Sequence, residues 1–132
     1  MKGLDTNVLI RYIARDDLHQ AVSADREISA CVAADEKMVL QPIVLCELIW
    51  VLETAYGFAK QDIIPVLERI LRTSQFEIVQ RDAAWRALNE YCKGRGDFSD
   101  YLLGECNYSA GAVETITFDK ALKSSLRFRV LK

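Results

Sequence analysis

Histidine is almost missing from this sequence: His19 is the only one in 132 residues. Serine and cysteine triads, two-histidine nuclease sites and histidine-rich metal sites all need imidazoles that the chain does not have or cannot spare. If the protein catalyses a reaction at neutral pH, we expect it to use carboxylates and metal ions.

Long hydrophobic runs and the segments of a signal peptide are also missing. The cysteines include no Cys-x-x-Cys pair and fall within apolar helical patterns: Cys31, Cys46, Cys92 and Cys106. That spacing favours reduced thiols packed in a core over a disulfide framework or a zinc site. We therefore expect a cytoplasmic protein with no membrane association.

An excess of positive charge is absent too, because the formal net charge is −2. The whole chain therefore has no general attraction to nucleic acid. After Asp119, basic residues follow without an acid among them: Lys120, Lys123, Arg127, Arg129 and Lys132. This cluster is equally consistent with a solvated surface and with contacts to phosphate.

What is present suits one ordinary domain, because 51% of the 132 residues are hydrophobic. We expect one domain over residues 1–132, with short strands at 1–4, 38–41, 76–79, 113–118 and 128–130. Helices separate the strands, which lie too far apart in the chain for hairpins. This alternation predicts an α/β fold with a parallel sheet of four to five strands and helices on both faces.

The predicted helices begin at recognisable signals. A capping box at Asp17 opens one that runs to about residue 34, Asp62 is the expected N-cap of another, and further helices are expected at 43–55, 82–93, 100–110 and 120–126. The helix at 43–55 is apolar nearly all round and is predicted to be buried. Glu47 interrupts it, and a buried carboxylate must be paired, protonated or bound to a metal.

Short polar side chains gather where predicted strands end and helices begin. Asp5, Thr6 and Asn7 occupy such a turn, and in an open α/β sheet ligands collect at this position. One of the three can simply cap the helix, but three exceed the needs of one cap. Thr117 and Asp119 follow a later strand in the same way.

Asp97 and Asp100 stand at the start of the helix expected at 100–110. Both have an ordinary structural role open to them, since Asp97 suits an N-cap and Asp100 the first helical turn. Below Asp100, however, Gly104 and Asn107 form a small, polar column at helical spacing. A carboxylate above such a column can face a cleft.

Four of these acids are expected at one edge of the sheet: Asp5, Glu47, Asp100 and Asp119. Desolvated carboxylates repel one another, so the cluster makes sense if it binds a hard divalent cation. Mg²⁺ and Mn²⁺ prefer oxygen ligands. Such an ion activates water as a nucleophile and offsets the charge of a phosphodiester during hydrolysis.

These motifs, in this order, resemble those of PIN-domain ribonucleases: Leu-Asp5-Thr-Asn-Val-Leu-Ile, Cys-Glu47-Leu-Ile-Trp, Asp97-Phe-Ser-Asp100-Tyr-Leu-Leu-Gly and Thr117-Phe-Asp119. In its compact size, and because the motifs span the whole chain, the protein is most similar to VapC-type toxins of bacterial type II toxin–antitoxin pairs. The resemblance implies a PIN-like three-layer sandwich and a magnesium-dependent endoribonuclease, with Mn²⁺ as a substitute. It also implies a homodimer, an RNA substrate with tRNA as a candidate, and an antitoxin whose tail occupies the active-site groove.

By that resemblance the catalytic and metal-binding acids are Asp5, Glu47, Asp100 and Asp119, with Thr6, Asn7 and Thr117 in support. The third acid is either Asp97 or Asp100. We prefer Asp100 because it immediately precedes Tyr-Leu-Leu, which leaves Asp97 as a cap or supporting residue. Candidate contacts to RNA phosphate are Arg11, Arg15, Lys120 and Lys123.

Other readings of the same acids fit less well. A haloacid-dehalogenase-type phosphatase also begins with a strand ending in Asp, but it needs a second Asp where this chain has Asn7. A phosphoacceptor receiver domain groups two acids before its first helix, which this chain does not. The non-enzyme alternative is a catalytically inactive PIN-like binding module whose acids are only caps and surface charge.

Overall fold

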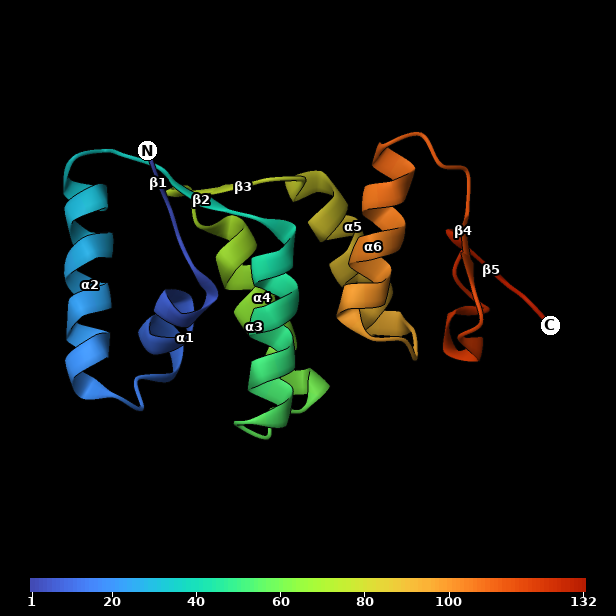
Figure 1. Cartoon of the computed structure of the whole chain (residues 1–132), viewed down its shortest axis with the longest axis horizontal. Helices are drawn as coiled ribbons and strands as arrows, with labels where there is room; N and C mark the ends of the chain where they lie inside the picture. The colour runs from blue at the N-terminus through green and yellow to red at the C-terminus, as the bar shows by residue number, and fades with distance from the viewer. The chain divides into compact units, whose positions relative to one another are not determined.

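The computed structural model describes all of residues 1–132 and divides into two compact units, Met1–Val79 and Gln80–Lys132 (Figure 1). Every strand pairing is parallel. The predicted α/β class is therefore confirmed, but the strands form a sheet of three in the first unit and a sheet of two in the second. That all 132 residues act as one domain stays a prediction.

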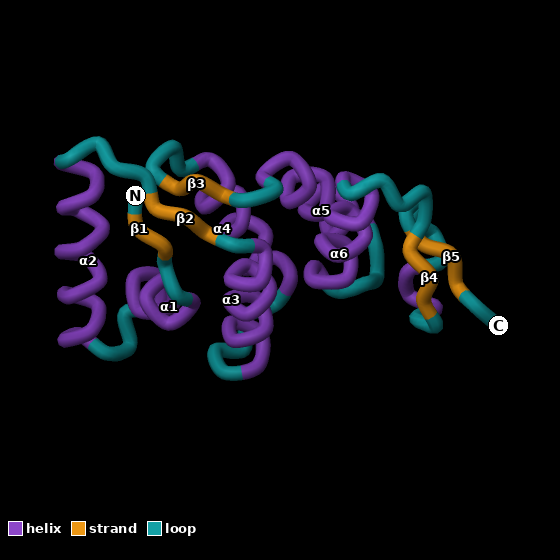
Figure 2. Tube along the Cα trace, turned by 45° about the horizontal axis from the view of Figure 1, so that its top comes forward, coloured by secondary structure: helices purple, strands orange, loops and turns teal.

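The first unit is built on the sheet β1-β2-β3, whose strands Figure 2 shows side by side in orange. Its elements are β1 (Lys2–Gly3), α1 (Thr6–Ala14), α2 (Leu18–Ala33), β2 (Met38–Leu40), α3 (Pro42–Thr54), α4 (Lys60–Arg72) and β3 (Phe76–Ile78). Met38 lies opposite Lys2 on one side and Phe76 on the other. Helix α1 packs against α2 and α3. Strand β1 is shorter than the strand predicted at 1–4 and ends at Gly3, two residues before Asp5.

Helix α3 is apolar nearly all round, but it is buried on one face only, so the prediction of a buried helix was wrong for the other face. Ile43 and Trp50 are 65% and 67% exposed, and Glu47 between them is exposed as well. These three residues share one face because they stand at i, i+4 and i+7. The core takes the other face, which carries Val44, Leu45, Leu48, Ile49 and Leu52.

Helix α4 begins three residues earlier than predicted. Ala59, and not Asp62, is the N-cap residue, and the Asp62 carboxylate accepts a hydrogen bond from the Ala59 backbone N–H at 2.9 Å. An acid at the third helical position that reaches back in this way satisfies a donor that the helix leaves unpaired. Pro65 consequently lies inside the helix, where its ring nitrogen has no hydrogen to donate.

The second unit pairs two helices with a two-stranded sheet. Its elements are α5 (Arg81–Lys93), α6 (Phe98–Ser109), β4 (Thr115–Thr117), the 3-10 turn η1 (Lys120–Leu122) and β5 (Phe128–Val130). Helices α5 and α6 pack on each other through rings such as Tyr91 and Phe98, whose centroids lie 6.0 Å apart edge to face. The edge strand predicted at 128–130 is confirmed, with Phe128 opposite Thr115.

The helix predicted at 120–126 is only the turn η1. It ends at Leu122, with Lys123 as its C-cap residue, and after it the Ser125 hydroxyl accepts a hydrogen bond from the Arg127 backbone N–H at 3.1 Å in the turn that leads to β5. Serine side chains commonly compete with helix bonding in this way.

All four cysteines are free thiols, but only Cys31 is fully buried. Cys92 is exposed, so the prediction that every cysteine packs in the core was wrong at that position. None of the helices has both the length and the apolar composition of a membrane span.

Candidate active site

The predicted acids fall into two groups, one in each unit. In the first unit Asp5 occupies the N-cap position of α1, yet its side chain makes no capping hydrogen bond. The carboxylate is exposed. The helix start instead relies on the Asp5 backbone carbonyl, which accepts from Val8 and Leu9. The side chain is therefore available to a ligand.

Thr6 links this turn to α3. The Thr6 side chain is buried, with 5% exposure, and its hydroxyl donates a hydrogen bond to Glu47 Oε1 at 3.1 Å. Because Thr6 follows Asp5 directly, this bond holds the Glu47 carboxylate beside the Asp5 turn. Glu47 itself is exposed, so the prediction of a buried carboxylate was wrong, since its face of α3 is not the packed one. Asn7 is exposed at the next position.

In the second unit, Asp97 and Asp100 stand at the start of α6. Asp97 is the N-cap residue, but its carboxylate makes no capping bond and is exposed. Burial raises the pKa of Asp100, and the negative charges of Asp97 and Asp119 raise it further, against a hydrogen bond from the Asp97 backbone that lowers it. The three carboxylates therefore lie close enough to repel one another.

Asp119 combines a structural bond with a free oxygen. Its Oδ1 accepts from the Ala121 backbone N–H at 2.9 Å and so caps η1, while the Asp119 N–H donates to Thr117 Oγ1 at 3.0 Å. Thr117 thus fixes the turn in which Asp119 lies. The second carboxylate oxygen of Asp119 remains open to a ligand.

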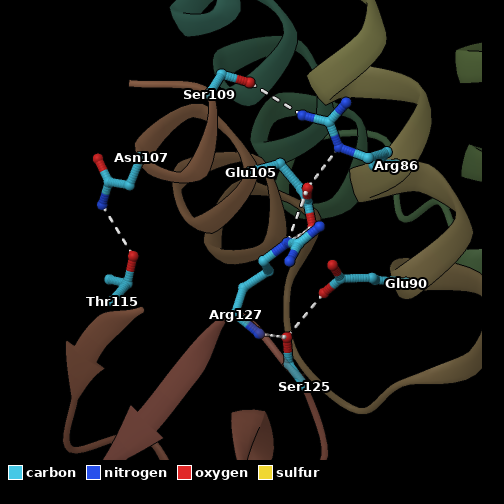
Figure 3. Close-up of polar contacts among 8 residues, drawn as sticks. All are labelled: Arg86, Glu90, Glu105, Asn107, Ser109, Thr115, Ser125 and Arg127. Carbon is cyan, nitrogen blue, oxygen red and sulfur yellow. Dashed lines mark hydrogen bonds and ion pairs between the residues drawn. The ribbon is translucent and has the colours of Figure 1, made fainter. Parts of the chain in front are cut away.

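The column below Asp100 is filled, not open. A Cβ on Gly104 would lie 2.6 Å from the ring of Phe128 on β5, and Asn107 Nδ2 donates to Thr115 Oγ1 on β4 at 3.0 Å (Figure 3). The cleft predicted beneath Asp100 is therefore taken up by the sheet. The same packing ties α6, which carries Asp100, to the strand that leads to Asp119.

Sequence reasoning missed a buried ionic cluster on α6, centred on Glu105, which is 1% exposed. Glu105 accepts from Arg86 Nε at 2.7 Å and from Arg127 Nε at 3.0 Å, as Figure 3 shows. The guanidinium of Arg127 also lies 3.5 Å from the centroid of the Tyr108 ring. No helical pattern marked Glu105, because its partners come from distant parts of the sequence.

Glu90 on α5 lies beside this cluster and accepts a hydrogen bond from Ser125 Oγ at 2.9 Å (Figure 3). Burial, followed by the hydrogen bond and charge of Glu105, raises the pKa of Glu90 to about 7. Two carboxylates and two guanidiniums thus lie in one partly buried cluster, in which Glu105 is paired with both arginines. They hold the C-terminal segment against α5 and α6.

The residues predicted to contact phosphate differ in whether they already form ion pairs within the chain. Arg11 pairs with Asp16 at 3.1 Å, and Arg15 pairs with Asp25 at 2.9 Å. Lys120 and Lys123 are exposed, and neither forms an ion pair. The basic cluster after Asp119 is also smaller than the sequence suggests, because Arg127 and Arg129 bind Glu105 and Glu114.

The donors of both groups suit a hard cation by type, because they are carboxylate, hydroxyl and amide oxygens. Burial first, and then the negative charges of Asp97 and Asp119, raise the pKa of Asp100, and a bound cation would favour its charged form. Neither unit by itself, however, holds three or more His, Cys, Asp or Glu side chains close enough together to bind a metal ion. The residues thus suit a divalent cation in the type of their donor atoms and in their negative charge.

Comparison with known proteins extends over nearly the whole chain. The family model described as "PIN domain" matches residues 3–124. A VapC ribonuclease of Aquifex aeolicus (strain VF5) is 27% identical over 123 residues, which cover 93% of this chain and 90% of that protein.

Proposed function

We propose, given that the chain belongs to the PIN domain family, that it is a magnesium-dependent endoribonuclease and the toxin of a toxin–antitoxin pair. The observation behind the proposal is that carboxylates of the predicted site make no structural hydrogen bond or are crowded by like charge. Asp5 and Asp97 stand at N-cap positions without capping bonds, and Asp100 is half-buried among like charges. The similarity to a VapC ribonuclease supplies the reaction class.

The proposed ligands of the metal are Asp5 and Asp100, with Glu47 and Asp119 orienting water or holding a second ion. Bound there, Mg²⁺ or Mn²⁺ would activate water and offset the charge of the phosphodiester. Thr6 keeps Glu47 beside the Asp5 turn. The Thr117 hydroxyl and the bond to Ala121 orient Asp119.

Contacts to the RNA backbone are proposed first for Lys120 and Lys123, which follow Asp119 and are not paired within the chain. Exposed ammonium groups of this kind contribute affinity that falls with salt. Arg11 and Arg15 remain part of the proposal, but each would exchange its carboxylate partner for phosphate. We further propose a cytoplasmic homodimer, an antitoxin partner and tRNA as a candidate substrate.

The choice between Asp97 and Asp100 follows from their surroundings. Asp100 is half-buried and feels the charges of both other acids, whereas Asp97 is exposed. Desolvation strengthens binding of a cation by a carboxylate. We therefore keep Asp100 as the third acid and Asp97 as a supporting residue.

Incubation of the full chain with total cellular RNA, in Mg²⁺ and in EDTA, tests the proposal. We expect cleavage in Mg²⁺ alone, near-complete loss of cleavage in Asp100→Asn and a smaller loss in Asp97→Asn. Asp82→Asn, an exposed acid in the first turn of α5, is the matched control and should cleave like the wild type. RNA left intact by the wild type in Mg²⁺ would favour the inactive binding module instead.

A further inference from the structure

We propose, building on the function above, that Tyr101 is a positioning residue for the acids of the second unit. It holds the loop between α5 and α6, which leads into Asp97, against the turn capped by Asp119. Tyr101 follows Asp100 directly in α6 and is 2% exposed. Its hydroxyl therefore acts inside the unit and not on a substrate.

The hydroxyl of Tyr101 fixes the loop by one buried bond. Its oxygen accepts a hydrogen bond from the Gly96 backbone N–H at 3.0 Å. Gly96 is buried and immediately precedes Asp97. A buried N–H left without an acceptor is unfavourable. We therefore expect the loop to shift when the hydroxyl oxygen of Tyr101 is removed.

The Tyr101 ring and Leu122 both pack closely against the same loop. A Cβ on Gly94 would overlap the Tyr101 hydroxyl, and a Cβ on Gly96 would lie 2.5 Å from Leu122 Cδ2 and 3.1 Å from Tyr101 Cζ. The two glycines are thus required by the close approach of these side chains. Residues at such a contact have little freedom to shift singly.

This contact connects all three acids. Leu122 belongs to η1, and its N–H donates to the Asp119 carbonyl at 3.2 Å. Gly96 leads to Asp97, and Tyr101 follows Asp100. The Tyr101 ring therefore packs on the loop that leads to Asp97 and belongs to the residue after Asp100, while Leu122, from the turn that Asp119 caps, closes on the same loop at Gly96. We infer that this packing sets the spacing of the three carboxylates. Groups that orient metal ligands typically change metal affinity by about 10-fold or more when they are removed.

The test compares Tyr101→Phe with Tyr108→Phe in the full chain. Both variants remove one hydroxyl from α6, but Tyr108 is exposed and keeps its ring over Arg127. Two quantities are measured: Mn²⁺ affinity from the EPR signal of free Mn²⁺, and exchange of the Gly96 amide hydrogen in metal-free protein. Ala87→Gly, at a buried position of α5, is the control for a general loss of stability.

We expect Tyr101→Phe to accelerate Gly96 exchange and to weaken Mn²⁺ binding by about 10-fold, while both control variants bind Mn²⁺ like the wild type. Unchanged Mn²⁺ affinity in Tyr101→Phe, beside a wild type that binds Mn²⁺, would overturn this inference and leave the proposed function intact. Equal weakening in Ala87→Gly would overturn it too. A wild type without Mn²⁺ affinity would overturn the proposed function itself.

Discussion

Replacing Glu90 by Gln should change how the stability of the second unit depends on pH. Glu90 has a pKa raised from its ordinary value of 4.5 to about 7 by burial and by Glu105. Its contribution to stability is complete below the ordinary pKa and is lost as pH rises through the raised one. Glutamine keeps an acceptor for Ser125 and a donor for Glu105 but cannot ionise.

The size of the effect follows from the shift. A rise from 4.5 to about 7 corresponds to about 3.4 kcal/mol at about 1.36 kcal/mol for each pH unit. Glu90 is only partly buried, so screening by solvent reduces this to about 1–2 kcal/mol. Glu90→Gln should therefore be more stable than the wild type by about 1–2 kcal/mol at pH 8.5 and about equal to it at pH 5.

Urea unfolding at several pH values between 5 and 8.5 measures the difference. Trp85 lies on α5, and a Trp50→Phe background leaves it as the only tryptophan to report on the second unit. Glu114→Gln, at an exposed glutamate of the same unit, is the control and should follow the wild-type profile. Parallel curves for wild type and Glu90→Gln would refute the role assigned to Glu90.

Three further substitutions test single contacts by thermal unfolding and RNA cleavage. Gly104→Ala should lower unfolding free energy by about 1–3 kcal/mol because its methyl group would overlap Phe128; an unchanged value would contradict the close packing. Thr6→Val should cost about 0.5–1.5 kcal/mol and lower cleavage by releasing Glu47, whereas full activity would remove its supporting role. Asp119→Ala should lose about 1 kcal/mol with the cap, while Asp119→Asn keeps stability but not cleavage.

The order of elements could be predicted because periodicity and turn residues are local signals. The short strands at 38–41 and 76–79 and the edge strand at 128–130 are present with small changes in their ends. One error came from tertiary context, because the composition of α3 could not show which face would pack. The error in the extent of η1 was local: the element ends at Leu122 and is followed by a turn with a bond from the Arg127 N–H to the Ser125 hydroxyl.

The candidate site was predictable as a set of residue types but not as geometry. Asp5 was marked by its place after a strand, and its carboxylate is indeed free. Glu47 was marked by apolar neighbours, a signal that suggested burial and missed its bond to Thr6. The Glu105 cluster gave no signal, because Arg86 and Arg127 lie 19 and 22 residues away in the sequence.

The initial rate of RNA cleavage by wild type and Asp5→Asn, measured across a range of Mg²⁺ concentrations, tests the central claim most directly. Asp5 is exposed and makes no capping bond, so the substitution should leave the melting temperature unchanged. We expect cleavage that rises with Mg²⁺ in the wild type and is absent in Asp5→Asn at every concentration. Cleavage by a folded Asp5→Asn at the wild-type rate, or wild-type cleavage that persists in EDTA, would contradict the account.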